Sequence, residues 1–229
     1  AKCPPAWHVG APTKNTEREI VKKVVIDARE SGSSTGRYID KLIEYLHKLQ
    51  PDFDVVILTK PERLQYISVV APKFTVVETL FKEFTFAEQT GLLRQINSLK
   101  PDLVHFGMVQ QPVLYGGKVV TTMHDLTTVR FRNPAKNSVV FWIKQQVYKW
   151  VNKAVAHKSF KIIVPSDYVK QDVAKFAHIN PDKIVVTHES ADAITAAPEP
   201  VKSLEPKQFI MHTGRPLPPK TLPRLVEAF

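Results

Sequence analysis

The sequence is poor in cysteine and has no long apolar run, and each of these scarcities excludes a class of protein. Cys3 is the single cysteine among 229 residues, so no disulfide can join two parts of the chain. A reducing compartment is therefore the default expectation. No stretch approaches the roughly 18 apolar residues of a membrane-spanning helix, and residues 1–18 lack the apolar stretch of a signal peptide. The sequence predicts a protein of the cytoplasm that does not span a membrane.

The chain is rich in basic charge. Its 32 lysines and arginines exceed its 22 aspartates and glutamates, which gives a formal net charge of +10. The apolar fraction of 43% and the charged fraction of 24% are those of ordinary globular domains, which excludes largely disordered, collagen-like and disulfide-scaffold classes. Excess positive charge is typical of proteins with phosphate-bearing partners, whether nucleic acid, nucleotide substrates or anionic lipid. Charge alone does not choose among the three.

Short β-branched apolar runs alternate along the chain with longer helical patterns. Because the apolar residues of each run are continuous rather than alternating, each run suits a strand that is buried on both faces of a parallel sheet. The fold class is therefore predicted as α/β, with a Rossmann-like, doubly wound parallel sheet. The six predicted strands are 24–28, 55–58, 103–106, 118–123, 161–165 and 183–187.

Helices are expected between these strands, and a change of composition divides the chain into domains. The periodicity predicts helices over 36–49, 86–99 and 138–157, and a fourth that begins after Ser166 as its N-cap. Residues 193–207 are rich in Ala and Pro, as linkers are. We expect four segments: a flexible leader (1–22), a Rossmann-like domain (23–192), the linker (193–207) and the first βα unit of an incomplete second domain (208–229).

The turn between the first strand and the first helix is the first candidate site. Its sequence, RESGSSTGRY, holds Gly32 and Gly36 around three small hydroxyl residues. Glycine lets the backbone approach an anion closely, and the helix that follows directs its N-terminal N–H groups at the same place. The spacing fits neither the dinucleotide-binding nor the Walker A glycine pattern. A plain turn with a helix cap is the alternative, but the first βα turn of an open sheet is where ligands enter.

A second candidate site, His124 and Asp125, follows the predicted strand 118–123. Histidine at the carboxyl edge of a sheet can hydrogen-bond a sugar hydroxyl or a carbonyl, and an aspartate can orient it. The alternative is that Asp125 forms an Asx turn and His124 is a packing residue. Neither His47 nor His105 has a His, Cys or carboxylate neighbour at metal-ligand spacing, so we expect no metal site.

Six segments follow one another along the chain: DARESGSSTGRYIDKLIEYL, KPDLVHF, TMHDL, KIIVPSDYVKQDV, PDKIVVTHESAD and FIMHTGRPLPPKTLPRLVEAF. Together they resemble the GT-B glycosyltransferases, and more closely the family 4-like enzymes, which are retaining and use nucleotide sugars. The resemblance extends from residue 23 to residue 229. It implies two Rossmann-like domains across a cleft, of which the first binds mainly the acceptor and the second the donor. HESAD departs from the family's pattern, of which only Asp192 remains.

The resemblance also implies roles for particular residues. Arg215 and Lys220 would neutralise the charge that develops on the departing diphosphate. The family's paired glutamates and most of its nucleotide pocket are expected beyond Phe229, so little turnover is expected of this chain alone. The implied site has a catalytic group of His124, Arg215 and Lys220, a donor-phosphate group of Gly32, Gly36, Arg37, Arg215 and Lys220, and Asp125 and Ser166 near the acceptor or the transferred sugar.

The predicted function is transfer of a sugar from a nucleotide-sugar donor to a glycan or lipid-linked acceptor with retention, this chain carrying the acceptor-side half. No cofactor is expected, since the nucleotide sugar is a substrate. The alternative is a non-catalytic α/β module that binds the acceptor or a membrane and needs a partner donor domain. We expect no specific nucleic-acid partner, because the sequence holds no recognisable nucleic-acid module.

Most of the excess positive charge lies between residues 130 and 170, which hold nine bases and one acid. Within the helix predicted there, Trp142 shares a face with Lys149 and Lys153, and we expect this face to point outward. Exposed tryptophan beside lysine is typical of a surface that rests on anionic lipid, here the inner face of the membrane. A solvated lysine-rich face is the alternative. The stripe expected to point inward consists of Ile143, Val147, Trp150, Val151 and Ala154.

Overall fold

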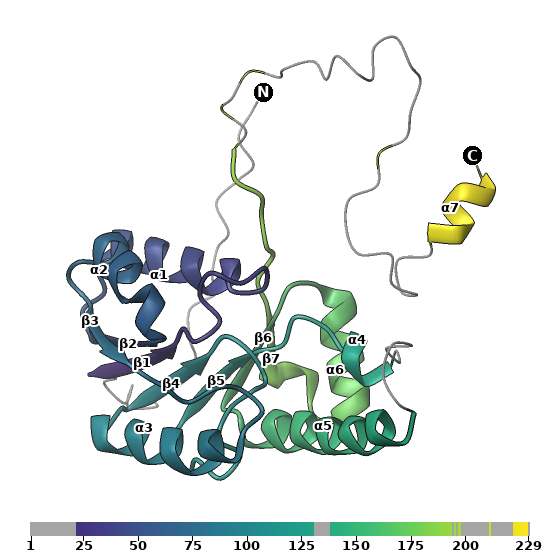
Figure 1. The fold of residues 1–229 in the computed structure, drawn as a ribbon, viewed down its shortest axis with the longest axis horizontal. Coiled ribbons are helices and arrows are strands. Elements are labelled where there is room, and N and C mark those ends of the chain that lie inside the picture. Colours follow the sequence, from purple (N-terminus) through teal and green to yellow (C-terminus); the bar gives the residue numbers. More distant parts are fainter. Residues whose placement is uncertain are drawn as a thin grey trace, which may run out of the picture.

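The computed structural model describes residues 22–130, 138–193, 195, 197, 211 and 222–228. In this part of the chain a parallel sheet is covered by helices on both faces (Figure 1). Its strands are β1 (Lys23–Asp27), β2 (Asp54–Thr59), β3 (Thr75–Glu78), β4 (Leu103–Phe106), β5 (Val119–Thr122), β6 (Lys161–Val164) and β7 (Ile184–Val186).

The strand order is β3-β2-β1-β4-β5-β6-β7, and every neighbouring pair is parallel. The predicted doubly wound α/β sheet is thereby confirmed, and each of the six predicted strands is present. The sequence pattern misses β3. This strand lies at the edge of the sheet, and its four residues TVVE are exposed or half-buried, so it lacks the longer apolar run of a strand that is covered on both faces.

Helices connect the strands, and Figure 1 shows α1 and α2 on one face of the sheet and α3 and α5 on the other. The predicted helices are confirmed, and 86–99 contains a π-helical turn. Ser166 caps its helix as expected, since its Oγ accepts the N–H of Val169 at 3.3 Å. The helices are α1 (Arg37–Leu49), η1 (Pro61–Arg63), α2 (Leu64–Val70), η2 (Glu88–Leu92), α3 (Leu93–Leu99), α4 (Thr127–Arg130), α5 (Ser138–Lys158), α6 (Asp167–Ala177), η3 (Pro181–Lys183) and α7 (Leu222–Ala228).

The core follows from the alternation of side chains along the strands. Successive residues of a strand point to opposite faces. Val24 and Ile26 of β1 therefore belong to one buried cluster with Ile43 of α1. Val25 belongs to another with Ile96 of α3. Burial on both faces fixes β1 at the centre of the sheet, and with it the turn that leaves its carboxyl end.

The inward stripe expected for α5 is wrong for three of its five residues. Ile143, Val147 and Trp150 are exposed, whereas Val151 packs against the core and Ala154 is half-buried. The helix has apolar residues on more than one side, so periodicity alone does not select the buried face. Small side chains decide it, because Val155 and Ala156 are fully buried where α5 packs into the core and let the helix approach the sheet closely.

Most of the predicted leader, linker and final βα unit lies outside the described residues, so the domain boundaries stay predictions. α7 falls within the segment where the last helix is expected. None of the helices in the described segments has the length and apolarity to cross a membrane.

Candidate functional site

The candidate site lies where the strand order changes direction, between β1 and β4. At such a point the loops that follow the two strands leave toward opposite faces and open a crevice at the carboxyl edge of the sheet. A shallow depression that is open to solvent lies here. It is lined by Asp27, Arg29, Glu30, Thr35, Glu83, Gly107, Met108 and Gln110.

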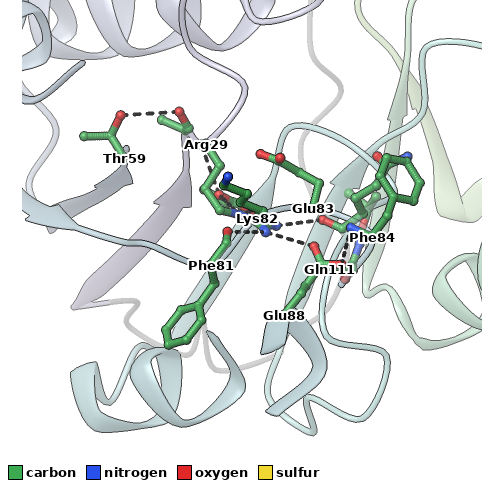
Figure 2. A network of polar contacts seen from close by, with 12 residues as sticks. Arg29, Thr59, Phe81, Lys82, Glu83, Phe84, Glu88 and Gln111 are labelled. Carbon is green, nitrogen blue, oxygen red and sulfur yellow. Dashed lines mark hydrogen bonds and ion pairs between the residues drawn. The ribbon is translucent and has the colours of Figure 1, made fainter. Parts of the chain in front are cut away.

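Arg29 is the central charged group of this depression, and it is only 2% exposed. Its guanidinium pairs with Asp27 at 2.7 Å and with Glu88 at 2.9 Å. It also donates to the carbonyl oxygens of Phe81 at 3.3 Å and Gln110 at 3.0 Å. Figure 2 shows Arg29 reaching both the Phe81 carbonyl and Glu88. One side chain thus ties the end of β1 to the loops after β3 and β4.

Carboxylates outnumber cations around this depression. Burial disfavours the charged guanidinium, but the attraction and hydrogen bonds of Asp27 and Glu88 outweigh burial and raise the pKa of Arg29. Burial raises the pKa of Glu88, against the opposing attraction of Arg29. Glu83 pairs with Lys60 at 3.0 Å. An acid-rich lining repels phosphate and suits a ligand that donates hydrogen bonds, as sugar hydroxyls do.

The glycine turn beside the depression is held together by its own chain. The Gly32 N–H donates to Asp40 Oδ2 at 3.2 Å, and the Gly36 N–H donates to Ser33 Oγ at 2.9 Å. Gly32 has a φ of +80°, which favours glycine. A Cβ at Gly36 would lie 1.7 Å from the carbonyl oxygen of Glu30. Both glycines thus have a structural reason to be there, and their contact with a phosphate stays a prediction.

Arg37 follows this turn at the start of α1 and is 46% exposed. Its guanidinium pairs with Asp192 at 2.7 Å and donates to the carbonyl oxygen of Ser190 at 3.3 Å. Lys41 contacts the same aspartate at 3.2 Å. Hydrogen bonds from Arg37 and Lys41 lower the pKa of Asp192, and the hydrogen bond to Asp192 raises the pKa of Arg37. The start of α1 is thereby joined to the segment that follows β7.

His124 lies close to the start of α1, after β5. Its Nδ1 is 2.8 Å from Glu189 Oε1, and its Nε2 is 3.2 Å from the carbonyl oxygen of Gly107. The ring also meets Tyr38 edge-on, with 5.0 Å between the ring centroids. A neutral imidazole has one N–H and donates to one of these two acceptors, whereas the protonated ring donates to both. The structure therefore places His124 against Tyr38, the residue after Arg37, and its contact with the transferred sugar stays a prediction.

The other predicted site residues have local roles or lie elsewhere. Asp125 Oδ1 accepts the Thr127 N–H at 2.8 Å, which is the Asx-turn alternative, and Ser166 caps α6. The predicted membrane-facing residues Trp142, Lys149 and Lys153 lie on α5. Arg215 and Lys220 lie outside the described residues. Across the described ranges, no group of three or more His, Cys, Asp or Glu side chains is placed to hold a metal ion.

Sequence reasoning missed the charged residues that shape the site. Arg29 and Glu88 are 59 positions apart and form an ion pair at 2.9 Å. Arg63 donates to Ser31 Oγ at 2.9 Å, and Ser31 donates to Asp40 at 2.5 Å. The one usable signal was local, because an arginine two residues after a buried aspartate faces the same side of the chain. The long-range partners have no sequence signature.

The chain is similar to parts of several solved proteins of bacteria. A glycosyltransferase from Rickettsia africae is 18% identical, with a TM-score of 0.48, and the match covers 75% of this chain and 44% of that chain. Anabaena Alr3699/HepE, solved in complex with UDP-glucose, is 12% identical, with a TM-score of 0.48 and coverage of 74% and 44%. MurG of Acinetobacter baumannii is 12% identical, with a TM-score of 0.44 and coverage of 77% and 48%. The chain therefore spans less than half the length of each of these structures.

A search of curated proteins gave no match. The sequence was also compared with models of protein families. The model described as Glycosyltransferase Family 4 matches residues 35–193, which is more than half of the chain and includes the end of the glycine turn, His124 and Asp192. On this match the chain belongs to glycosyltransferase family 4.

Proposed function

We propose that this chain is the acceptor-side half of a retaining glycosyltransferase that takes its sugar from a nucleotide-sugar donor. The family match over residues 35–193 carries the proposal. The geometry adds two neighbouring regions of unlike chemistry at the carboxyl edge of the sheet: an acid-rich depression around Arg29 and a basic rim at Arg37.

The depression is the proposed place of the acceptor. Gln110 is 8% exposed and lines the depression. Its side chain hydrogen-bonds Tyr148 of α5, but its Oε1 has no partner among the described residues. A buried acceptor without a partner costs free energy until a donor reaches it. A hydroxyl of a glycan or of a lipid-linked sugar supplies such a donor. The carboxylate of Glu30, also in the lining, offers a second acceptor for a neighbouring hydroxyl.

The rim is the proposed contact of the donor diphosphate. The Arg37–Asp192 pair is exposed on both sides, and exposed pairs contribute little to stability. A diphosphate can therefore displace Asp192 and accept hydrogen bonds from both sides of the guanidinium fork. Arg215 and Lys220 are proposed to approach the same diphosphate from the second domain and to stabilise its charge as it departs.

His124 is proposed to orient the sugar between the two substrates. Its ring lies against Tyr38, one residue after Arg37, and bonds Gly107, which lines the depression. A sugar that bridges donor and acceptor passes this ring. A hydroxyl of that sugar can replace Glu189 or the Gly107 carbonyl as the partner of one ring nitrogen.

Binding and transfer test the proposal separately. The chain is titrated with UDP-, GDP- and ADP-sugars and with a panel of saccharides in an NMR or calorimetric assay. Transfer is then assayed with the same panel, with and without an extract of the source cells. Product with the donor's anomeric configuration supports retention, and the inverted configuration contradicts retention alone. Absence of all binding and all transfer contradicts the proposal.

Two substitutions separate the two substrate contacts. Arg37→Gln should weaken nucleotide-sugar binding by about tenfold to a hundredfold, because it removes charge-assisted hydrogen bonds, and should leave acceptor binding unchanged. Gln110→Leu should weaken acceptor binding and leave nucleotide-sugar binding unchanged. Arg94→Gln is the matched control for the loss of one exposed positive charge on another helix, α3. If Arg37→Gln and Arg94→Gln weaken donor binding equally, Arg37 makes no specific contact with it.

A further inference from the structure

An apolar face of α5 is turned to solvent. Trp142, Ile143, Val147 and Trp150 are each between 53% and 61% exposed. Residues 143, 147 and 150 follow the i, i+4, i+7 spacing that places side chains in one stripe of a helix, and residue 142 borders it. Exposed apolar residues that are scattered singly need no explanation, but four on two turns of one helix mark an interaction surface.

The charges around this face have a single sign. α5 carries Lys144, Lys149, Lys153 and Lys158 and not one aspartate or glutamate over its 21 residues. Lys149 and Lys153 share the stripe of Trp142, and Lys144 lies beyond Val147 on the opposite flank. Lys158 is turned away, since its Nζ donates to the carbonyl oxygens of Pro112 and Val113.

Acidic residues near α5 include Asp125, which acts electrostatically on Tyr148 of α5, and the two aspartates of the neighbouring helix α6. Contact between the two helices is direct, because Lys153 Nζ lies 5.4 Å from the Phe176 ring centroid. On α6, Asp172 is already paired with Arg130. Asp167 lies in the first turn of α6, and the other charged residues of that helix are Lys170 and Lys175. The surface as a whole is therefore apolar at its centre and basic at its flanks.

We propose that this face of α5 docks on an anionic lipid surface. Tryptophan and aliphatic side chains enter the boundary between headgroups and acyl chains, while flanking lysines remain at the level of the phosphates. A protein partner that fits this face would need an apolar groove with acidic residues around it. An anionic lipid leaflet offers negative headgroups and an apolar interior over any area. Other occupants, such as a second copy of this chain or another segment of the same protein, are outcomes of the test below.

The test is sedimentation of the 229-residue chain with vesicles of phosphatidylcholine alone and of phosphatidylcholine mixed with phosphatidylglycerol. We expect binding to the anionic vesicles, which weakens as salt is added. Trp142→Gln with Trp150→Gln should lower the partition coefficient by at least about tenfold, because two large apolar side chains no longer enter the lipid. Lys149→Gln with Lys153→Gln should lower it roughly fivefold for each lysine removed.

Matched controls lie on the opposite face of the sheet. Tyr45→Gln with Leu49→Gln removes two exposed apolar side chains from α1, and Lys48→Gln with Lys73→Gln removes two exposed charges near it. Both control pairs should bind vesicles as the unchanged chain does. Far-UV circular dichroism confirms that each variant is folded.

Three results would overturn the docking surface. They are equal binding to both kinds of vesicle, equal loss of binding in the α5 and control pairs, and no vesicle binding at all. Light scattering tests for a second copy as the occupant. If the chain forms a dimer that the tryptophan substitutions dissociate, and it does not bind vesicles, the face is assigned to a second copy. Because the test needs no nucleotide sugar, its outcome is independent of the proposed sugar transfer.

Discussion

Two arginines, Arg29 and Arg37, lie eight residues apart on either side of the same glycine turn, and they differ in almost every physical respect. Arg29 is 2% exposed and pairs with Asp27 and Glu88, which are 7% and 3% exposed. Arg37 is 46% exposed and pairs with Asp192, which is 60% exposed. Water cannot reach the partners of Arg29 to replace them, whereas it can reach both Arg37 and Asp192.

This difference assigns separate tasks to the two side chains. Removing one partner of a buried ion pair leaves a charge that nothing solvates, so Arg29 is bound to its position and fixes the loops around the depression. An exposed pair exchanges its partner at little cost, which is the property that the proposed diphosphate contact requires of Arg37. The buried arginine holds the loops in place, and ligand binding is proposed only for the exposed one.

The largest expected effect is the loss of Arg29. Arg29→Met leaves Asp27 and Glu88 buried without a cation, and should lower the free energy of unfolding by about 3–5 kcal/mol. Urea denaturation followed by circular dichroism measures this. Arg37→Met is the matched control in the same turn and should lower the unfolding free energy far less, because its ion pair is exposed to solvent. If the two variants lower the unfolding free energy equally, burial does not make the ion pairs of Arg29 more important for stability than that of Arg37.

A buried titratable group without an ionic partner sharpens the comparison. His105 is buried in β4, its Nε2 is 3.0 Å from Thr122 Oγ1, and burial lowers its pKa from 6.5 to about 4. The folded protein therefore binds a proton less readily than the unfolded chain. The contribution of neutral His105 is fully present above pH 6.5 and is lost as the pH falls toward 4.

His105→Gln should remove this part of the acid sensitivity. The fall in unfolding free energy between pH 6.5 and pH 4 should become smaller by about 3 kcal/mol, because each pKa unit corresponds to about 1.4 kcal/mol. Denaturation curves at a series of pH values measure the difference. His157→Gln, which replaces an exposed histidine of α5, is the matched control for the loss of an imidazole. An unchanged slope in His105→Gln would show that the ring binds a proton as readily in the folded protein as in the unfolded chain.

The glycine turn gives the next smaller effect. A Cβ at Gly36 would meet the Glu30 carbonyl oxygen at 1.7 Å, whereas a Cβ at Gly116 would meet nothing within 4 Å. Gly36→Ala forces the backbone of the turn to move and should cost about 1–3 kcal/mol. Gly116→Ala should be close to neutral, and thermal unfolding compares the two. Equal melting temperatures would mean that the backbone of the turn accommodates the added methyl group without a loss of stability.

The fold was more predictable from the sequence than the site. Continuous apolar runs such as 55–58 and 103–106 report burial directly, so the parallel sheet and its strands followed from the pattern. The strand β3 and the buried face of α5 did not, because each depends on what packs against it. His124 was singled out from its place after a buried strand, and its role stays a prediction. Arg29 was missed, since its partner Glu88 lies 59 positions away at the start of η2 and an arginine normally indicates surface.

The smallest expected effect is the coupling between Arg37 and Asp192, and it decides whether the exposed pair is exchangeable. In a double-mutant cycle of Arg37→Gln and Asp192→Asn, the pair should show only a small coupling in unfolding free energy at low salt. The coupling should shrink as salt is added, because both groups are solvent-exposed and are screened. Asp192→Asn alone should then strengthen the binding of a nucleoside diphosphate to Arg37, since it removes the competing carboxylate. A coupling as large as that of Arg29, or weaker diphosphate binding in Asp192→Asn, would mean that Asp192 locks Arg37 in place and that the ligand contacts another part of the rim.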